Sequence, residues 1–343
     1  MQKKLTSGAL LNEKGHLNQA GYATKLVKSY DPKQIKAPKW RIKEWDYYLI
    51  YNKDYAVALT VADNRYMGML SASFIDLLKP EEKTSSIITL FTNGKTNMPT
   101  TSKCGDVCAS EKGTKFEFLN DGKKRILKCH YENFNGNDAL EVEFLLGKEP
   151  KDSIVIATPF ENKPKAFYYN QKIVGIPASG RVKYGEKEIV FDAKDTFAIL
   201  DWGRGVWPYK NTWYWSSACG VVDGKKIGFN LGYGFGDTSA ASENILFCGD
   251  YSHKLDQVVF NIPTNEKGQF EYEKQWTITS NDGRVEMVFD PIIDRKSCTD
   301  VLVLKSDQHQ VFGKFSGTII LDDGTALKIK DFVGFAERVV NKW

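Results

Sequence analysis

Four titratable side chains between residues 201 and 253 are the candidates for acid–base chemistry: Asp201, Asp237, Glu243 and His253. They lie in a tryptophan- and glycine-rich stretch, where we expect burial among aromatic rings to raise the pKa of one carboxyl group while another stays ionised. Such a pair suits hydration, isomerisation or cyclisation of a small molecule, and it suits glycoside hydrolysis equally well. Alternatively, these carboxylates are turn and cap residues, as in residues 237–243.

A histidine and an arginine in the same stretch bear on this hypothesis. His253 titrates near neutrality and is a candidate acid or base, although a lone loop histidine is more often a surface residue. Arg204 stands between two glycines and is predicted to bind an anion, or to form a salt bridge with Asp201 or Asp237. In the most specific form of the hypothesis, Asp201 and Asp237 meet at one rim, with Arg204 between them.

Aromatic side chains supply the wall of the predicted cavity. Residues 200–250 hold four of the eight tryptophans. An indole is both apolar and a hydrogen-bond donor, so an aromatic barrel mouth accommodates an apolar ring or the face of a sugar. The residues predicted to bind substrate are Arg204, Trp207, Trp213, Trp215, Tyr233 and Trp45.

The elements that position these residues are predicted to be strands. Asp223-Gly224 is typical of a tight hairpin turn, and the strand after it carries glycines on one face, from Gly228 to Gly236. Such a row predicts a bent barrel wall or a close approach by a ligand or by backbone, and tight packing inside a small barrel is the alternative. The alternation of apolar residues predicts further strands near residues 45–51, 55–61, 66–74, 86–90, 114–119, 126–131 and 140–145, and a short helix is expected within residues 20–29.

An internal repeat indicates two copies of one β unit. Ser179-Gly is followed by Phe197-Ala, and Ser316-Gly is followed by Phe335-Ala at nearly the same interval. We therefore expect an N-terminal arm over residues 1–35, a first β-barrel over 36–195 and a second over 196–343, which carries the tryptophan- and glycine-rich stretch.

Particular motifs in that stretch resemble a known family. Asp201-Trp-Gly-Arg-Gly-Val-Trp207, Trp213-Tyr-Trp215, Asp223-Gly224 and Asn230-Leu-Gly-Tyr-Gly-Phe-Gly-Asp237 resemble a bacterial family known only as a domain of unknown function. More distantly, their order is similar to tandem lipocalin-like (calycin) proteins, which include carotenoid hydratases and tocopherol cyclases. This resemblance implies an all-β fold of two calycin-type barrels with few helices, and a ligand cavity in one barrel or between both. It does not carry over a substrate.

Composition excludes several classes of function. The net charge of +4 is small and scattered, so no basic stripe marks a nucleic-acid partner. No apolar run is long enough to span a membrane, and no secretory signal is evident, so we expect a cytoplasmic protein without integral membrane association and with reduced thiols. Cys104 and Cys108 lack a second matching pair, and no nucleotide fingerprint is present, so no metal and no cofactor are expected.

These observations favour a cofactor-independent enzyme that uses carboxylates in an aromatic cavity on a small or amphiphilic organic substrate. A glycoside-processing enzyme is one alternative, because paired carboxylates and tryptophan platforms also suit sugars. A non-catalytic carrier of an apolar ligand is another, because a carrier needs the aromatic cavity without the buried carboxylates. The expected ligand is therefore a small molecule, a sugar or an amphiphile.

Overall fold

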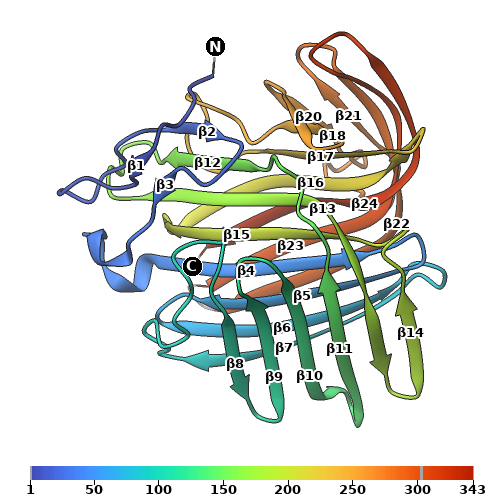
Figure 1. Cartoon of the computed structure of the whole chain (residues 1–343), viewed down its shortest axis with the longest axis horizontal. Coiled ribbons are helices and arrows are strands. Elements are labelled where there is room, and N and C mark those ends of the chain that lie inside the picture. The colour runs from blue at the N-terminus through green and yellow to red at the C-terminus, as the bar shows by residue number, and fades with distance from the viewer. Residues whose placement is uncertain (1, 302–303, 343) are drawn as a thin grey trace.

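The computed structural model describes residues 2–301 and 304–342, and β-strands dominate this part of the chain (Figure 1). Its helical segments are two single 3-10 turns, η1 (Pro32–Gln34) and η2 (Lys39–Arg41). The predicted all-β fold of two tandem barrels is confirmed. The helix expected within residues 20–29 is wrong, because this segment forms β2 (Gly21–Ala23) and β3 (Lys28–Ser29), which pair with other parts of the first half.

The first half is a sheet of thirteen strands with the main order β7-β6-β5-β4-β15-β13-β11-β10-β9-β8. Strands β2, β12 and β14 pair beside that path, and β1 (Gly8–Ala9) pairs with β3 in a separate parallel ribbon. The remaining strands are β4 (Ile42–Tyr51), β5 (Tyr55–Asp63), β6 (Met67–Asp76), β7 (Glu81–Leu90), β8 (Val107–Glu111), β9 (Thr114–Asn120), β10 (Arg125–Asn135), β11 (Asp138–Leu146), β12 (Ile154–Pro159), β13 (Phe167–Tyr184), β14 (Lys187–Phe191) and β15 (Phe197–Val206).

The second half is a nine-stranded antiparallel sheet with the order β19-β18-β17-β16-β24-β23-β22-β21-β20. Its hairpin turn at Asp223-Gly224 has positive φ at both residues, as the sequence predicts. Its strands are β16 (Lys210–Val222), β17 (Lys225–Tyr233), β18 (Ile245–Cys248), β19 (Tyr251–Lys254), β20 (Val258–Asn261), β21 (Trp276–Ser280), β22 (Val285–Val301), β23 (Leu304–Ile320) and β24 (Ala326–Lys342).

The boundary between the two hydrogen-bonded sheets lies later in the chain than the internal repeat suggests. β15 pairs with β4 and β13 of the first sheet, and the second sheet starts with β16 at Lys210. The connection between these strands is therefore the short segment 207–209. The division into domains near residue 195, and the separate arm over residues 1–35, stay proposals.

Three buried clusters form the apolar core, one inside each curled sheet and one between them. The third cluster fills the seam, which we define as the space between β4, β15 and β13 of the first sheet and β16, β24 and β23 of the second (Figure 1). Because side chains alternate along a strand, each of these strands directs the side chains of one face into the interior of its own half and those of the other face into the seam. The seam is where the candidate site lies.

Candidate functional site

A buried lysine stands at the centre of the seam. The Lys172 side chain is 3% exposed, and its Nζ lies 3.4 Å from Asp201 Oδ1 and 3.1 Å from Glu243 Oε2. It also donates hydrogen bonds to the Tyr168 hydroxyl at 3.0 Å and to Asn170 Oδ1 at 2.9 Å. Lys172 on β13 and Asp201 on β15 are direct partners in the antiparallel register, which is why they meet.

Lys172 is a fixed cation despite its burial. Burial alone lowers the pKa of the lysine, but the carboxylates of Asp201 and Glu243 outweigh it and raise this pKa well above the ordinary value. The ammonium group also lies 4.7 Å from the ring centroid of Trp215, within the range of a cation–π contact. The two acidic groups are therefore held beside a permanent positive charge.

Neutral donors complete the surroundings of both carboxylates. Asp201 accepts a hydrogen bond from Trp45 Nε1 at 3.1 Å and another from the Asn170 amide. Glu243 Oε2 accepts a hydrogen bond from Asn230 Nδ2 at 3.0 Å. The side-chain oxygen of Asn230, Oδ1, in turn accepts a hydrogen bond from Trp215 Nε1 at 2.7 Å. Both carboxylates are thus oriented by groups that are themselves fixed, as in many preorganised sites.

A second acidic centre faces this cluster from the other sheet. Glu337 on β24 is buried and accepts hydrogen bonds from Trp213 Nε1 and Gln310 Nε2, each at 2.8 Å. The pKa of Glu337 is raised to about 7. Burial is the main cause and the charge of Asp201 adds to it, while the two hydrogen bonds act in the opposite direction. The seam therefore contains a carboxyl group that is partly protonated near neutrality.

The two acidic centres belong to facing rows of paired residues. One row crosses the first sheet through directly paired residues of three strands, and the other crosses five strands of the second sheet. The Tyr47 hydroxyl bridges the rows by contacting Gln310 Oε1 at 3.4 Å. The first row is Tyr47, Asp201 and Lys172, and the second is Gly232, Trp215, Glu337, Gln310 and Arg295.

Glycines allow side chains of the seam to approach the backbone. A Cβ on Gly232 would lie 2.6 Å from Glu243 Oε1, so the missing side chain leaves room for that carboxylate. A Cβ on Gly203 would overlap the indole ring of Trp45. In the glycine row of β17, the group that approaches Gly232 most closely is thus a side-chain carboxylate, whereas the sequence predicted a ligand or backbone.

Five aromatic rings cover one end of the polar cluster. They make edge or stacked contacts with centroid separations from 4.7 to 6.4 Å. Trp45 and Trp213 remain partly exposed, so solvent reaches the outer side of this aromatic rim. Within the described chain, the buried Trp207 Nε1 has no hydrogen-bond partner. The rim consists of Trp45, Tyr168, Trp207, Trp213 and Phe235.

The structure brings Asp201 and Glu243 together but places Asp237 and His253 elsewhere. Asp237 is exposed in the loop after β17, where hydrogen bonds from Ser239 lower its pKa. His253 lies on β19, and its Nδ1 accepts a hydrogen bond from the Asp322 backbone at 3.2 Å. The expected meeting of Asp201 and Asp237 at one rim therefore does not occur.

Arg204 does not lie between the carboxylates either. Since Arg204 follows Asp201 by an odd number of residues on the same strand, its side chain points to the opposite face, into the first half. There it donates to Asp46 Oδ1 at 3.0 Å and to the Pro99 carbonyl at 2.8 Å. The salt bridge expected with Asp201 or Asp237 is wrong for the same reason.

The remaining predicted aromatic residues divide between the two faces. Trp45, Trp207, Trp213 and Trp215 all reach the seam. Tyr233 instead points into the second half, where its ring stacks on Tyr214 at 4.5 Å between centroids.

Sequence reasoning missed Lys172, Glu337 and Gln310. The available signal was a charged or polar side chain next to apolar residues within a strand: Ile-Val follows Lys172, and Phe-Ala precedes Glu337.

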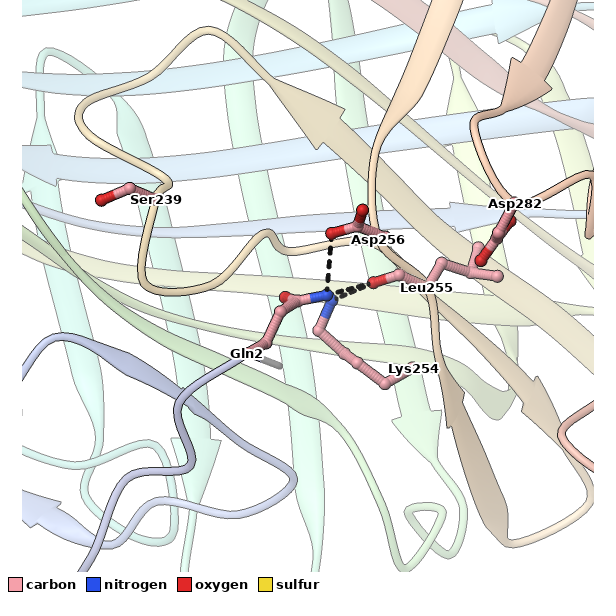
Figure 2. Close-up of a pocket in the computed structure, with 6 residues that line it drawn as sticks. All are labelled: Gln2, Ser239, Lys254, Leu255, Asp256 and Asp282. Atoms are coloured by element: carbon pink, nitrogen blue, oxygen red, sulfur yellow. Dashed lines mark hydrogen bonds between the residues drawn. The ribbon is translucent and has the colours of Figure 1, made fainter.

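A polar hollow lies away from the seam (Figure 2). It has a volume of about 340 Å³ and is lined by Gln2, Ser239, Lys254, Leu255, Asp256 and Asp282. Burial lowers the pKa of Lys254 to about 7, but its Nζ already donates to Ser242 Oγ and to the carbonyls of Asn244 and Leu255, at 2.6 to 2.9 Å. Because this lysine is fully engaged in holding loops together, we place the candidate chemistry at the seam.

Gly203→Ala is expected to destabilise the protein by about 1–3 kcal/mol, the usual effect of overpacking. The added methyl group displaces the Trp45 ring and with it the hydrogen bond to Asp201. Urea denaturation of Gly203→Ala, Trp45→Ala and the double variant measures this coupling. If the methyl group costs as much in the Trp45→Ala background as in the native protein, the close approach is not what constrains Gly203.

Fold and site together define a protein of two tandem β-barrel halves with a charged, aromatic-lined seam between them. The chain belongs to the family described as Domain of unknown function (DUF2804), which matches residues 2–343. A comparison with curated proteins found no match. Within the described part of the chain, no helix has the length and apolar character needed to cross a membrane.

Several solved structures are similar to this one, and two of them illustrate the likeness. A protein from Nitrosomonas europaea, provisionally assigned as an AttH, has 12% sequence identity and a TM-score of 0.55, with 92% of this chain and 98% of that chain covered. Kievitone hydratase from Nectria haematococca has 12% identity and a TM-score of 0.48, with 98% of each chain covered. At this identity, the likeness to the first structure establishes the fold alone.

Proposed function

We propose that the seam is the active site of a cofactor-independent enzyme that transfers protons to and from a small amphiphilic molecule, in the hydration, isomerisation or cyclisation class. The observation that carries the proposal is a pair of acidic groups whose surroundings separate their protonation states. Burial raises the pKa of Glu337 to about 7, while Asp201 lies 3.4 Å from the Lys172 cation. A protonated acid beside a fixed carboxylate is the arrangement that general acid–base catalysis requires.

In a hydration reaction, Glu337 acts as the acid and Asp201 as the base. The Glu337 carboxyl gives its proton to one carbon of a C=C bond, which forms a C–H bond and leaves a carbocation at the other carbon. A water molecule forms a C–O bond there while Asp201 accepts the proton that the water loses. After product release, Asp201 returns this proton to solvent and Glu337 regains one, so the enzyme is unchanged.

The other groups of the seam have supporting roles in this scheme. Lys172 forms an ion pair with Asp201 and so balances the negative charge of that carboxylate, while Asn170 accepts a hydrogen bond from the same ammonium group. The aromatic rim binds the apolar part of the substrate, and its ring faces stabilise a developing cation. Trp207 Nε1, which has no partner among the described residues, is available to a polar group of the ligand.

Deuterium transfer to carbon tests the proposal even while the natural substrate is unidentified. The purified protein is incubated in D₂O with a panel of isoprenoid and phenolic alkenes and alcohols, and carbon-bound deuterium is measured by mass spectrometry. We expect Glu337→Gln and Asp201→Asn to lower the rate of incorporation by roughly 10²-fold or more, the usual scale for general acid–base catalysis. Quenching of tryptophan fluorescence by the compound should persist in both variants.

Glu286→Gln is the matched control, because Glu286 is exposed on β22, outside the seam. Equal incorporation by native protein and both seam variants would show that these groups are not the acid and base. Fluorescence quenching without any deuterium transfer would favour the carrier alternative. Hydrolysis of aryl glycosides included in the panel would favour the glycoside-processing alternative.

A further inference from the structure

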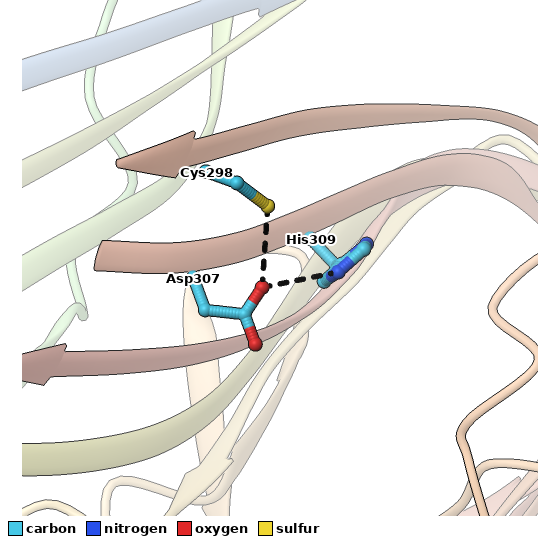
Figure 3. Close-up of side chains that lie close together, drawn as sticks. All are labelled: Cys298, Asp307 and His309. Atoms are coloured by element: carbon cyan, nitrogen blue, oxygen red, sulfur yellow. Dashed lines mark hydrogen bonds and ion pairs between the residues drawn. The ribbon is translucent and has the colours of Figure 1, made fainter. Parts of the chain in front are cut away.

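Three side chains with different donor atoms converge on the inner face of the second half, apart from the seam (Figure 3). They are Cys298 on β22 and Asp307 and His309 on β23. Cys298 and Asp307 are direct partners in the antiparallel register, and His309 follows on the same face of β23. Asp307 Oδ1 lies 3.4 Å from Cys298 Sγ and 3.4 Å from His309 Nε2.

These separations are those of ligands around one tetrahedral ion. With Zn–S near 2.3 Å and Zn–N or Zn–O near 2.0–2.2 Å, neighbouring ligand atoms in a tetrahedron lie roughly 3.4–3.6 Å apart. Both distances from Asp307 Oδ1 agree with this value, and all three ligand atoms lie within 4.8 Å of one another.

The neighbours of His309 orient its imidazole ring in the way that is usual for a metal-binding histidine. His309 Nδ1 lies 2.7 Å from the carboxylate of Asp294, which favours the tautomer with the proton on Nδ1 and the lone pair of Nε2 facing Asp307 and Cys298. The Tyr272 ring stacks on the imidazole with 3.8 Å between centroids. A carboxylate behind the histidine is the usual outer contact of a metal-bound imidazole.

Asp307 is oriented as well. Its Oδ2 lies 3.9 Å from Arg338 Nη1, so the other oxygen, Oδ1, remains directed at Cys298 and His309. Cys298 is exposed, which gives an ion a path from solvent. A thiolate and a carboxylate together balance the charge of a divalent cation, and the histidine binds as a neutral ligand.

We propose that Cys298, Asp307 and His309 bind one zinc-type divalent cation, with a fourth position open to water. The mixture of sulfur, nitrogen and oxygen donors favours zinc over magnesium or calcium, which prefer oxygen ligands alone. The site is separate from the proposed active site, because the neighbouring residues Arg295 and Gln310 point to the seam on the opposite face of the same strands.

The expectation that the chain binds no metal relied on paired Cys and His spacing. Here the ligands come from two strands, and Cys298 reaches the other two only across the hairpin that joins them. His309 has no metal-ligand motif around it in the sequence, so only the strand register reveals its companions.

Metal titration of the full chain tests the site. The protein is stripped with a chelator, dialysed and titrated with zinc by calorimetry, and with cobalt(II) as a spectroscopic probe. We expect one ion per chain and, with cobalt, a thiolate-to-metal charge-transfer band that disappears in Cys298→Ser. Asp307→Asn and His309→Gln should weaken zinc binding at least as much as Asp294→Asn, for which loss of an outer contact predicts about 10–100-fold.

Cys108→Ser and His130→Gln are the matched controls, because both side chains are exposed on the first half and should not affect binding. Circular dichroism verifies that each variant is folded. Absence of stoichiometric zinc binding, or unchanged affinity in both Cys298→Ser and His309→Gln, overturns the proposal. Zinc binding that depends on Cys108 would place the metal elsewhere and overturn it equally.

Discussion

Replacing Lys172 with methionine should lower the free energy of unfolding by about 3–5 kcal/mol, the usual effect of removing one partner from a buried ion pair. Methionine fills a similar volume, so the loss is electrostatic rather than a cavity effect. Asp201 and Glu243 would remain buried without their cation, and their two negative charges would repel each other. Urea denaturation near pH 7, followed by tryptophan fluorescence, measures the change.

Lys187→Met is the control for loss of a lysine–carboxylate pair. The Lys187 side chain is 47% exposed and its Nζ lies 2.9 Å from Asp76, so its removal should cost at most about 1 kcal/mol. Neutralising the acids in the triple variant Lys172→Met, Asp201→Asn, Glu243→Gln should recover most of the stability. A loss below about 1 kcal/mol in Lys172→Met alone would mean that the carboxylates do not depend on the lysine.

Glu337 should make the protein less stable as the pH rises from about 4.5 to about 7. Its pKa is 4.5 when free and about 7 in the folded protein, so between these values the folded state binds more protons than the unfolded state. Stability therefore falls with pH across this window and levels off above it. At 1.36 kcal/mol for each pKa unit, the full effect is about 3 kcal/mol.

The difference in stability between Glu337→Gln and native protein isolates this contribution. Because other groups cancel, the variant should gain about 3 kcal/mol relative to native protein between pH 4.5 and pH 8. Glu286→Gln, which changes an exposed glutamate, should show no such trend. A pH-independent difference for Glu337→Gln would show that folding does not change the pKa of Glu337.

The fold could be predicted because its signals are local. The strands β4 and β5 and the Asp223-Gly224 turn are each signalled by a few consecutive residues, and the structure confirms them. The predicted helix in β2 and β3 failed because that segment takes its conformation from pairing with distant strands, which overrides weak local preference.

The candidate site could be predicted only in part, because it depends on register between distant strands. Asp201 was visible in a conspicuous motif, but its cation, Lys172, lies on another strand and meets it only through the pairing of β13 with β15. Arg204 looked like a natural partner in sequence, yet strand alternation turns it away. Glu337 lies on β24 and comes close to Asp201 only because two sheets pack face to face.

The alternation of β22 and β23 has a consequence for insertions and deletions. Consecutive residues on these strands serve different sites: Asp294 and His309 belong to the proposed metal site, while Arg295 and Gln310 face the seam. Adding or removing one residue within β23 would exchange the two faces beyond that point and disrupt both sites at once. Length variation among related sequences should therefore be confined to the hairpin turns, and the spacing from Cys298 to Glu337 should change only there.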